Sequence, residues 1–116
     1  MRVTRLDKAP PYIAPLHEGV GTLRLQGLEA GPTDRFWVGL SYYLPAGEAQ
    51  ESPTREETVY VVLDGELTIT SDGAQEVLQQ HDSVHLPKGT VRSVVNNSAR
   101  PATLLVIIGT PQEQVA

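Results

Sequence analysis

The chain has no cysteine, few aromatic residues and few histidines. It contains three histidines, and aromatic residues make up 5% of its 116 positions. Without cysteine, disulfide bonds, thiolate nucleophiles and cysteine metal ligands are excluded. No histidine lies between His17 and His81. The chain therefore offers little imidazole for zinc, copper, iron or nickel, the metals that this ligand suits.

Long apolar runs and clusters of basic residues are also missing. The longest aliphatic run, Leu104 to Ile108, is far below the roughly 20 residues that a membrane-spanning helix needs. Nine basic and fourteen acidic residues give a net charge of -5, so we expect neither nucleic acid nor an anionic membrane as a partner. No apolar signal core precedes the Pro10-Pro11 pair, and we expect a cytoplasmic protein without an export signal.

The length and composition suit a single globular domain over residues 1–116. With 40% hydrophobic residues, a chain of this size buries about two-thirds of its unfolded surface. Residues 1–20 contain Pro10, Pro11 and Pro15 and show little periodicity. We expect this segment to be an extended arm that lies over the body of the protein or over a partner subunit.

The rest of the chain has the alternation and turn signals of short β-strands. Pro45-Ala46-Gly47 is expected to end a long strand, and residues 48–55 are expected to be irregular. Asp64-Gly65 is a two-residue turn signal that predicts a hairpin between its flanking strands. The strands are expected at residues 22–26, 36–44, 58–63, 66–70, 75–79, 83–86, 90–96 and 102–108. Such spacing, with almost no helical period, predicts an all-β barrel or jelly roll.

Two of the expected strands are apolar on both faces. Residues 59–63 and 104–108 consist almost entirely of aliphatic side chains. A half-exposed antiparallel strand would alternate, so both faces of these strands must be covered. One face is expected to line the barrel. The other is expected to meet a second subunit in a homodimer, or to be covered by the N-terminal arm.

Two segments resemble the paired motifs of the cupin superfamily, over residues 36–108. In the second motif Pro87, Gly89 and Asn96 fall in place, His81 occupies the opening glycine position, and Arg92 stands where the histidine ligand belongs. In the first motif one alignment places Ser52, Thr54 and Thr58 on the two histidine positions and the glutamate position. The resemblance implies a double-stranded β-helix, the jelly-roll barrel of cupins, preceded here by an extended arm.

The same alignment leaves no set of metal ligands. If residues 81–85 are extended, His81 and His85 are about 13 Å apart and do not chelate one ion. Glu57 replaces the motif glutamate only if a one-residue bulge precedes its strand. We therefore expect no metal and no cofactor. A metalloenzyme with non-standard ligands, such as Glu51, Glu56, Glu57 and His85, is the least favoured alternative.

By analogy with cupins, the residues at the motif positions point into the barrel and surround a small-molecule ligand. A buried arginine stays charged and is costly unless paired, so Arg92 needs an anionic partner. That partner is either an internal carboxylate, Glu57 or Glu51, or the carboxylate of a ligand held between aromatic side chains. The expected ligand-binding residues are Arg92, Thr58, Tyr60, Tyr42, Trp37, Ser52, Thr54 and Asn96.

Two functional hypotheses follow, because a barrel of this kind does not specify a reaction. The first is a metal-independent cupin that binds a small carboxylated or aromatic metabolite. The second is a small acid/base enzyme, an isomerase or lyase, in which Glu57 or His85 transfers a proton. The substitution Glu57→Gln separates them, because it should abolish turnover only under the second hypothesis.

Overall fold

The computed structural model describes residues 1–112, which form an all-β protein with two short 3-10 helices. The strands are β1 (His17–Gln26), β2 (Phe36–Pro53), β3 (Thr58–Asp64), β4 (Leu67–Ser71), β5 (Ala74–Leu78), β6 (Ser83–Leu86), β7 (Val91–Val95) and β8 (Ala102–Gly109). The helices are η1 (Leu6–Lys8) and η2 (Leu28–Ala30). The all-β jelly roll that the sequence predicts is confirmed.

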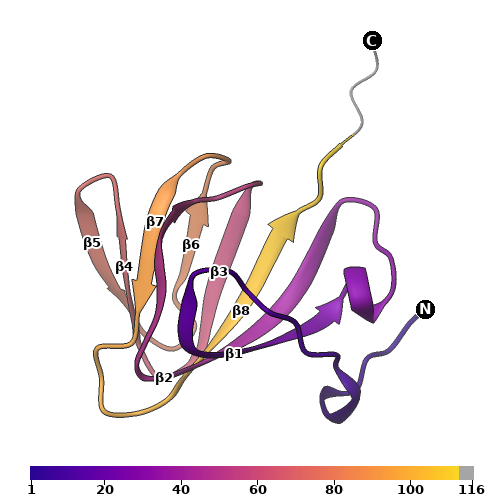
Figure 1. Ribbon diagram of the computed structural model, residues 1–116, viewed down its shortest axis with the longest axis horizontal. Helices are drawn as coiled ribbons and strands as arrows, with labels where there is room; N and C mark the ends of the chain where they lie inside the picture. Colours follow the sequence, from indigo (N-terminus) through magenta and orange to yellow (C-terminus); the bar gives the residue numbers. More distant parts are fainter. Residues whose placement is uncertain (113–116) are drawn as a thin grey trace.

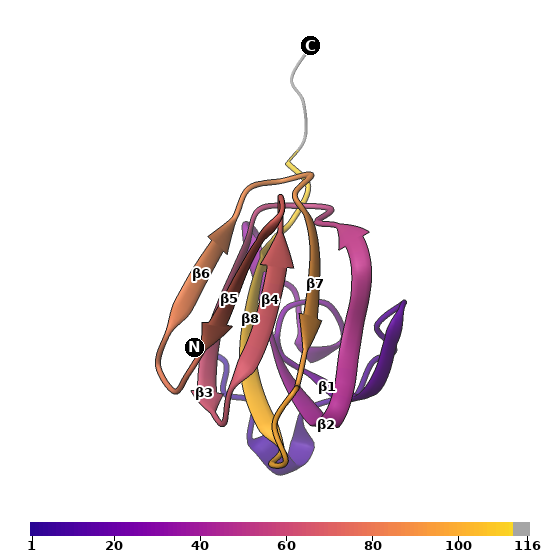
Figure 2. The same ribbon diagram turned by 90° about the vertical axis from the view of Figure 1, so that its left-hand side faces the viewer.

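The strands form one antiparallel sheet that curls into a barrel (Figures 1 and 2). Their order is β5-β4-β7-β2-β8-β3-β6, and β1 pairs with β2 outside this path. The long strand β2 belongs to both walls. Its first half pairs with β1 and β8, and its second half pairs with β7. The barrel interior lies between these walls.

The prediction that β2 ends at Pro45-Ala46-Gly47 is wrong. Ala46 adopts a left-handed conformation, with φ of 67°, and the strand continues through it. The bend is held by the residue that follows β7, because Ala46 N donates to the Asn96 carbonyl and Asn96 N donates to the Gly47 carbonyl, both at 2.9 Å. A Cβ atom on Gly47 would lie 2.4 Å from the Gly19 carbonyl oxygen. The turn signal therefore marks a bend between two walls.

The predicted hairpin at Asp64-Gly65 is also wrong. β3 pairs with β6 and β8, whereas β4 pairs with β5 and β7. Gly65, with φ of 76°, takes the chain across from one wall to the other. The tight hairpin is at Asp72-Gly73, where both residues have positive φ and join β4 to β5, as two-residue hairpin turns require.

Alternate residues of the strands point into the barrel, as the period of two predicts. On β3 the inward residues Tyr60 and Val62 are 5% and 0% exposed, and on β8 Leu104 and Val106 are 2% and 5% exposed. Burial of an aliphatic side chain of this size stabilises the fold by about 1.5–3 kcal/mol. On β7 the inward residues are Arg92 and Val94, and the buried Asn96 follows directly after the strand.

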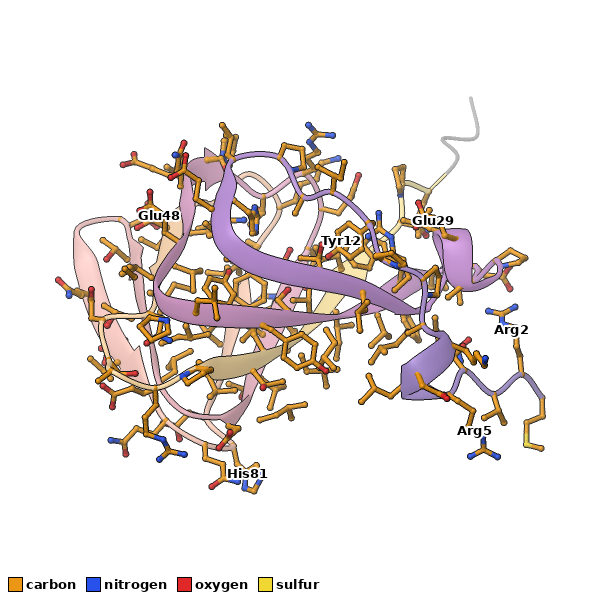
Figure 3. All side chains as sticks on the ribbon, turned by 60° about the horizontal axis from the view of Figure 1, so that its bottom comes forward. Arg2, Arg5, Tyr12, Glu29, Glu48 and His81 are labelled. Carbon is orange, nitrogen blue, oxygen red and sulfur yellow. The ribbon has the colours of Figure 1, made fainter. Side chains whose placement is uncertain are left out.

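The N-terminal arm extends one wall of the barrel beyond β1. Pro11 forms a bridge with Leu23 of β1, Arg24 N donates to the Pro10 carbonyl at 2.8 Å, and Tyr12 N donates to the Thr22 carbonyl at 3.1 Å. In Figure 3 the labelled Tyr12 lies beside β1. Strand β1 begins at His17, within the segment expected to be an arm, so this histidine belongs to the barrel wall.

The outward face of β3 and β8 is aliphatic and half-buried in the single chain. It carries Val59, Val61, Leu105 and Ile107. The expectation that a second subunit covers this face stays a prediction. Within residues 1–112, no helix has the length and apolar character needed to cross a membrane.

Candidate functional site

Arg92 forms the centre of a polar group inside the barrel. Its Nε donates a hydrogen bond to the Tyr60 hydroxyl at 3.0 Å. Its Nη1 donates to Ser52 Oγ at 3.0 Å and to the Gln50 carbonyl at 3.2 Å. Ser52 lies directly opposite Arg92 in the pairing of β2 with β7, and β3 presents Tyr60. All three acceptors are neutral, so none of them balances the guanidinium charge.

The internal carboxylate expected as a partner of Arg92 is not found in residues 1–112. Glu51 is exposed and lines a cavity together with Val91, away from Glu57. Glu57 is bound instead to His85. Within the described chain Arg92 takes part in no ion pair, although the residue is only 9% exposed. A buried charge of this kind is costly, and the polar groups of a ligand would lower that cost.

The positions at which cupins hold a metal do not fit one here. A guanidinium has only donors, so Arg92 has no lone pair for an ion. The Thr54 hydroxyl donates to the Pro87 carbonyl at 2.8 Å, and the Thr58 hydroxyl donates to the Glu56 carbonyl at 2.9 Å. Both threonines hold loops at the barrel rim. No group of three or more His, Asp or Glu residues within residues 1–112 is arranged to hold a metal ion.

Asn96 is fully buried and uses its side chain to hold the connection between β7 and β8. Its Nδ2 donates to the Tyr43 carbonyl at 3.1 Å and to the Arg100 carbonyl at 2.7 Å. Its Oδ1 accepts from the backbone N–H and the hydroxyl of Ser98. These four bonds use the capacity of the amide group, so Asn96 has none left for a ligand.

Trp37 lies in a second cluster, where the arm meets β1. The Arg24 guanidinium is stacked on the Tyr12 ring at 3.4 Å and on the Trp37 ring at 4.3 Å, measured to the ring centroids. Arg24 Nε also contacts Glu29 Oε2 at 2.6 Å, and this hydrogen bond lowers the pKa of Glu29. Burial raises the pKa of Tyr12. Within residues 1–112, Arg24 Nη1 is buried without a hydrogen-bond partner.

Tyr42 lies on the outward face of β2 and is 37% exposed. Its neighbour Tyr43 points into the barrel and is 2% exposed, and burial raises the pKa of its hydroxyl. The expectation that Tyr42 forms a wall of the interior site is therefore wrong, and Tyr43 takes that place. Because the adjacent Tyr42 and Tyr43 lie on opposite faces of this strand, residue type alone does not tell which of the two points inward.

His17 joins the interior group from β1. It pairs with Ala49 of β2, which pairs in turn with Val94 of β7, so the three residues form one inward-facing row. Arg92 lies two residues along β7 on the same face. His17 Nδ1 lies 2.7 Å from the Pro15 carbonyl. Burial lowers the pKa of His17, and the charge of Arg92 lowers it further, although the bond to Pro15 acts against both.

Glu57 and His85 meet outside the barrel. Glu57 Oε2 lies 2.6 Å from His85 Nε2, and the two side chains are 71% and 55% exposed. His85 pairs with Val59, whose side chain is on the outward face, so the contact lies on that face. An open cavity of about 450 Å³ adjoins it and is lined by Arg35, Phe36, Glu56, Glu57, Val59, Ile107, Gly109, Thr110 and Gln112.

Sequence reasoning missed the places of Tyr12 and Arg24 and gave His17 little weight. Leu23 and Leu25 flank Arg24, and this alternation would put the arginine in water. Period two counted back from Thr22 would put His17 on the outward face, and the irregularity between Glu18 and Val20 is what brings it to the inward face. The contact of Tyr12 in the arm with Arg24 could not be predicted from the alternation of residues within the strand.

The protein-family model described as "Cupin domain" matches residues 39–108 of this chain. Over all 116 residues the chain is 60% identical to the protein named beta-D-galactosidase Rv1717 from Mycobacterium tuberculosis, and the match covers 100% of both chains. The chain is also similar to several solved structures. These matches involve far lower sequence identity, so most of them show the fold alone.

The polyketide cyclase RemF from Streptomyces resistomycificus has a TM-score of 0.81 at 18% identity, over 94% of this chain and 79% of that one. An RmlC-like cupin from Shewanella frigidimarina has a TM-score of 0.78 at 17% identity, over 97% and 94%. A sugar phosphate isomerase of the cupin superfamily from Silicibacter pomeroyi has a TM-score of 0.76 at 25% identity, over 93% and 74%. The matched domain and the full-length relative show that this chain belongs to the cupin family.

Proposed function

We propose that this protein is a metal-independent cupin that binds and hydrolyses a β-D-galactoside inside its barrel. The observation that carries the proposal is the 60% identity to the protein named beta-D-galactosidase Rv1717, because the match extends over the full length of both chains.

The polar group around Arg92 supports a sugar as the ligand. A galactoside is neutral and rich in hydroxyl groups, each of which donates and accepts hydrogen bonds. Arg92, Tyr60 and Ser52 are already held in place by one another, and His17 lies on the same interior surface. Sites for small molecules typically place a few fixed polar groups beside apolar side chains, and the inward residues of β3 and β8 form the hydrophobic core next to this polar group.

The test is hydrolysis of 4-nitrophenyl β-D-galactoside by purified protein after treatment with EDTA. Release of nitrophenol should persist, and the matching α-galactoside and β-glucoside should react much more slowly. Arg92→Ala should abolish binding of galactose in calorimetry, whereas Arg100→Ala, at an exposed arginine, should retain it. Activity that disappears with EDTA and returns with a metal would contradict the proposal.

Binding of a small organic acid is a second candidate function. It is favoured by the absence, within residues 1–112, of any carboxylate paired with Arg92. A ligand carboxylate would match the planar guanidinium and supply the missing charge. Calorimetry with benzoate, galactonate and galactose separates the two candidates. Tight binding of the acids that is lost in Arg92→Ala, with no binding of galactose, would favour the acid.

An isomerase or lyase that uses Glu57 or His85 is a third candidate. It is favoured by the 2.6 Å contact between these side chains beside an open cavity of about 450 Å³. A carboxylate and an imidazole in contact are groups that transfer protons. Under this candidate, Glu57→Gln abolishes turnover and leaves ligand binding intact. Under the galactoside proposal, Glu57→Gln leaves hydrolysis within about threefold of the wild-type rate.

We also infer that the protein forms a homodimer through the outward face of β3 and β8. The half-buried Val59, Val61, Leu105 and Ile107 adjoin Phe36, which is 49% exposed. Apolar side chains that gather on one outward face favour association between subunits. Light scattering should give twice the chain mass of 12.6 kDa, and Val61→Lys should give a monomer. A wild-type monomer at high concentration would contradict the inference.

A further inference from the structure

We propose that His17 accepts a proton from the attacking water in the barrel and that the Tyr60 hydroxyl gives one to the departing oxygen. This inference rests on the proposed function and assigns roles within its site. Glycoside hydrolysis usually employs two carboxyl groups. Among the buried residues of the described chain Arg92 is the only ionised one, and none is Asp or Glu. Proton transfer inside this barrel therefore needs other groups.

The hydrogen bond of His17 to the arm makes its outer nitrogen a base. A backbone carbonyl only accepts hydrogen bonds, so the 2.7 Å contact with the Pro15 oxygen places the ring proton on Nδ1. The lone pair is then on Nε2, which is free to accept a proton. Burial and the Arg92 charge lower the pKa of His17, and this keeps the ring neutral at neutral pH.

The contact with Arg92 prepares Tyr60 to give up a proton. Arg92 Nε donates to the Tyr60 oxygen at 3.0 Å, so the hydroxyl hydrogen is left to point elsewhere. The same N–H remains bonded to the oxygen after the proton has left, and the guanidinium charge then stabilises the phenolate. Tyr60 is 5% exposed, so little solvent competes for this position.

The proposed step is a single displacement at the anomeric carbon. The water oxygen bonds to that carbon while one of the water protons passes to His17 Nε2. The bond between the carbon and the leaving oxygen breaks with its electron pair, and that oxygen takes the Tyr60 proton. The imidazolium then returns its extra proton to the phenolate through water, and no other reactant is needed. Attack by water from the opposite side gives the α-anomer of galactose first.

The test compares two galactosides in variants of each residue. His17→Asn keeps a donor near the Pro15 carbonyl and removes Nε2, so kcat should fall about 10²–10⁴-fold on both substrates with KM nearly unchanged. Tyr60→Phe should lower kcat strongly on lactose and far less on 4-nitrophenyl β-D-galactoside, because nitrophenolate leaves without a proton. The matched controls are His81→Asn and Tyr42→Phe, which change exposed residues away from the barrel interior.

The outcomes separate this inference from the proposed function. A wild-type protein that hydrolyses neither substrate would overturn the proposed function. A wild-type protein that hydrolyses both, with His17→Asn equally active, would overturn only the proton-transfer roles of His17 and Tyr60. Proton NMR that shows β-galactose as the first product would overturn the single displacement. Galactose binding and the unfolding temperature of each variant show that a loss of rate is not a loss of folding.

Discussion

The barrel interior and the open cavity beside Glu57, called the outer cavity below, both bring ionisable side chains together. They do so under opposite conditions. Inside, Arg92 is buried among neutral acceptors. Outside, Glu57 and His85 form a close pair that is largely in water. An exposed pair contributes little, about 0–1 kcal/mol, and needs no special explanation. A buried charge without a counter-ion is costly to the fold. The interior group therefore has the stronger claim to a function.

The largest expected effect is the loss of activity on removal of Arg92. Arg92→Ala should lower kcat/KM for 4-nitrophenyl β-D-galactoside by at least about 100-fold, since a lost hydrogen bond to a charged group costs about 1.5–3 kcal/mol and several are lost together. Glu57→Gln is the matched change in the outer cavity and should stay within about threefold. Steady-state kinetics on both variants measures the contrast. The reverse order of effects would move the site to the outer cavity.

The next effect separates structural from ligand-binding polar residues inside the barrel. Asn96→Ala leaves the Tyr43 and Arg100 carbonyls without their donor, and each buried unsatisfied group costs about 1–3 kcal/mol. The free energy of unfolding in urea should fall by about 2–4 kcal/mol. Arg92→Met should change it far less, because it removes a costly charge. Equal losses in the two variants would show that Arg92 is held for stability.

A smaller effect is expected where the arm closes over β1. Tyr12→Ala removes one face of the stack on Arg24, and cation–π contacts contribute about 0.5–2 kcal/mol. We expect a lower unfolding temperature and faster cleavage of the arm by trypsin, with Tyr42→Ala as the exposed control. An arm that resists trypsin equally well in Tyr12→Ala would show that this stack does not hold it.

The smallest effect concerns pH. The pKa of His17 is lower in the folded protein than its ordinary value near 6.5, so the unfolded chain takes up the proton first as the pH falls. His17 therefore contributes a loss of stability that begins near pH 6.5 and grows until the folded pKa is passed. Urea unfolding between pH 7.5 and pH 5 should show a weaker decline in His17→Asn than in the wild type. Parallel declines would contradict this role.

The sequence predicted the barrel well because the signals involved are local. The analogy with cupins put Tyr60 and Arg92 on inward faces, and period two puts Val62 and Val94 on the same faces. The burial of all four residues confirms this placement. The resemblance to cupins supplied the motif positions. Turn signals were located correctly, but at Asp64-Gly65 the strands on either side pair elsewhere. Which strands pair depends on the whole barrel, and a local signal contains no such information.

The site was predicted only in part, because some of its contacts also depend on the pairing of distant strands. Arg92, Tyr60 and Ser52 do meet. Ser52 reaches the inward face only after the irregularity between Ala49 and Ser52, and its place was given by the cupin motif and not by period two. The partners of Thr54 and Asn96 are backbone carbonyls of distant loops. The histidine at position 17 enters the barrel because β1 pairs with β2 near Ala49. That long-range register is set by tertiary packing and is not visible in the chain itself.

The most direct test of the account is a galactose titration followed by NMR of the Arg92 side-chain Nε–H, assigned by comparison with Arg92→Met. We predict a saturable shift of this signal and of the backbone amides of Tyr60 in β3 and Arg92 in β7. The amides beside Glu57 and His85 should remain unchanged. A titration that moves those amides and leaves the Arg92 signal in place would contradict the assignment of the ligand site to the barrel interior.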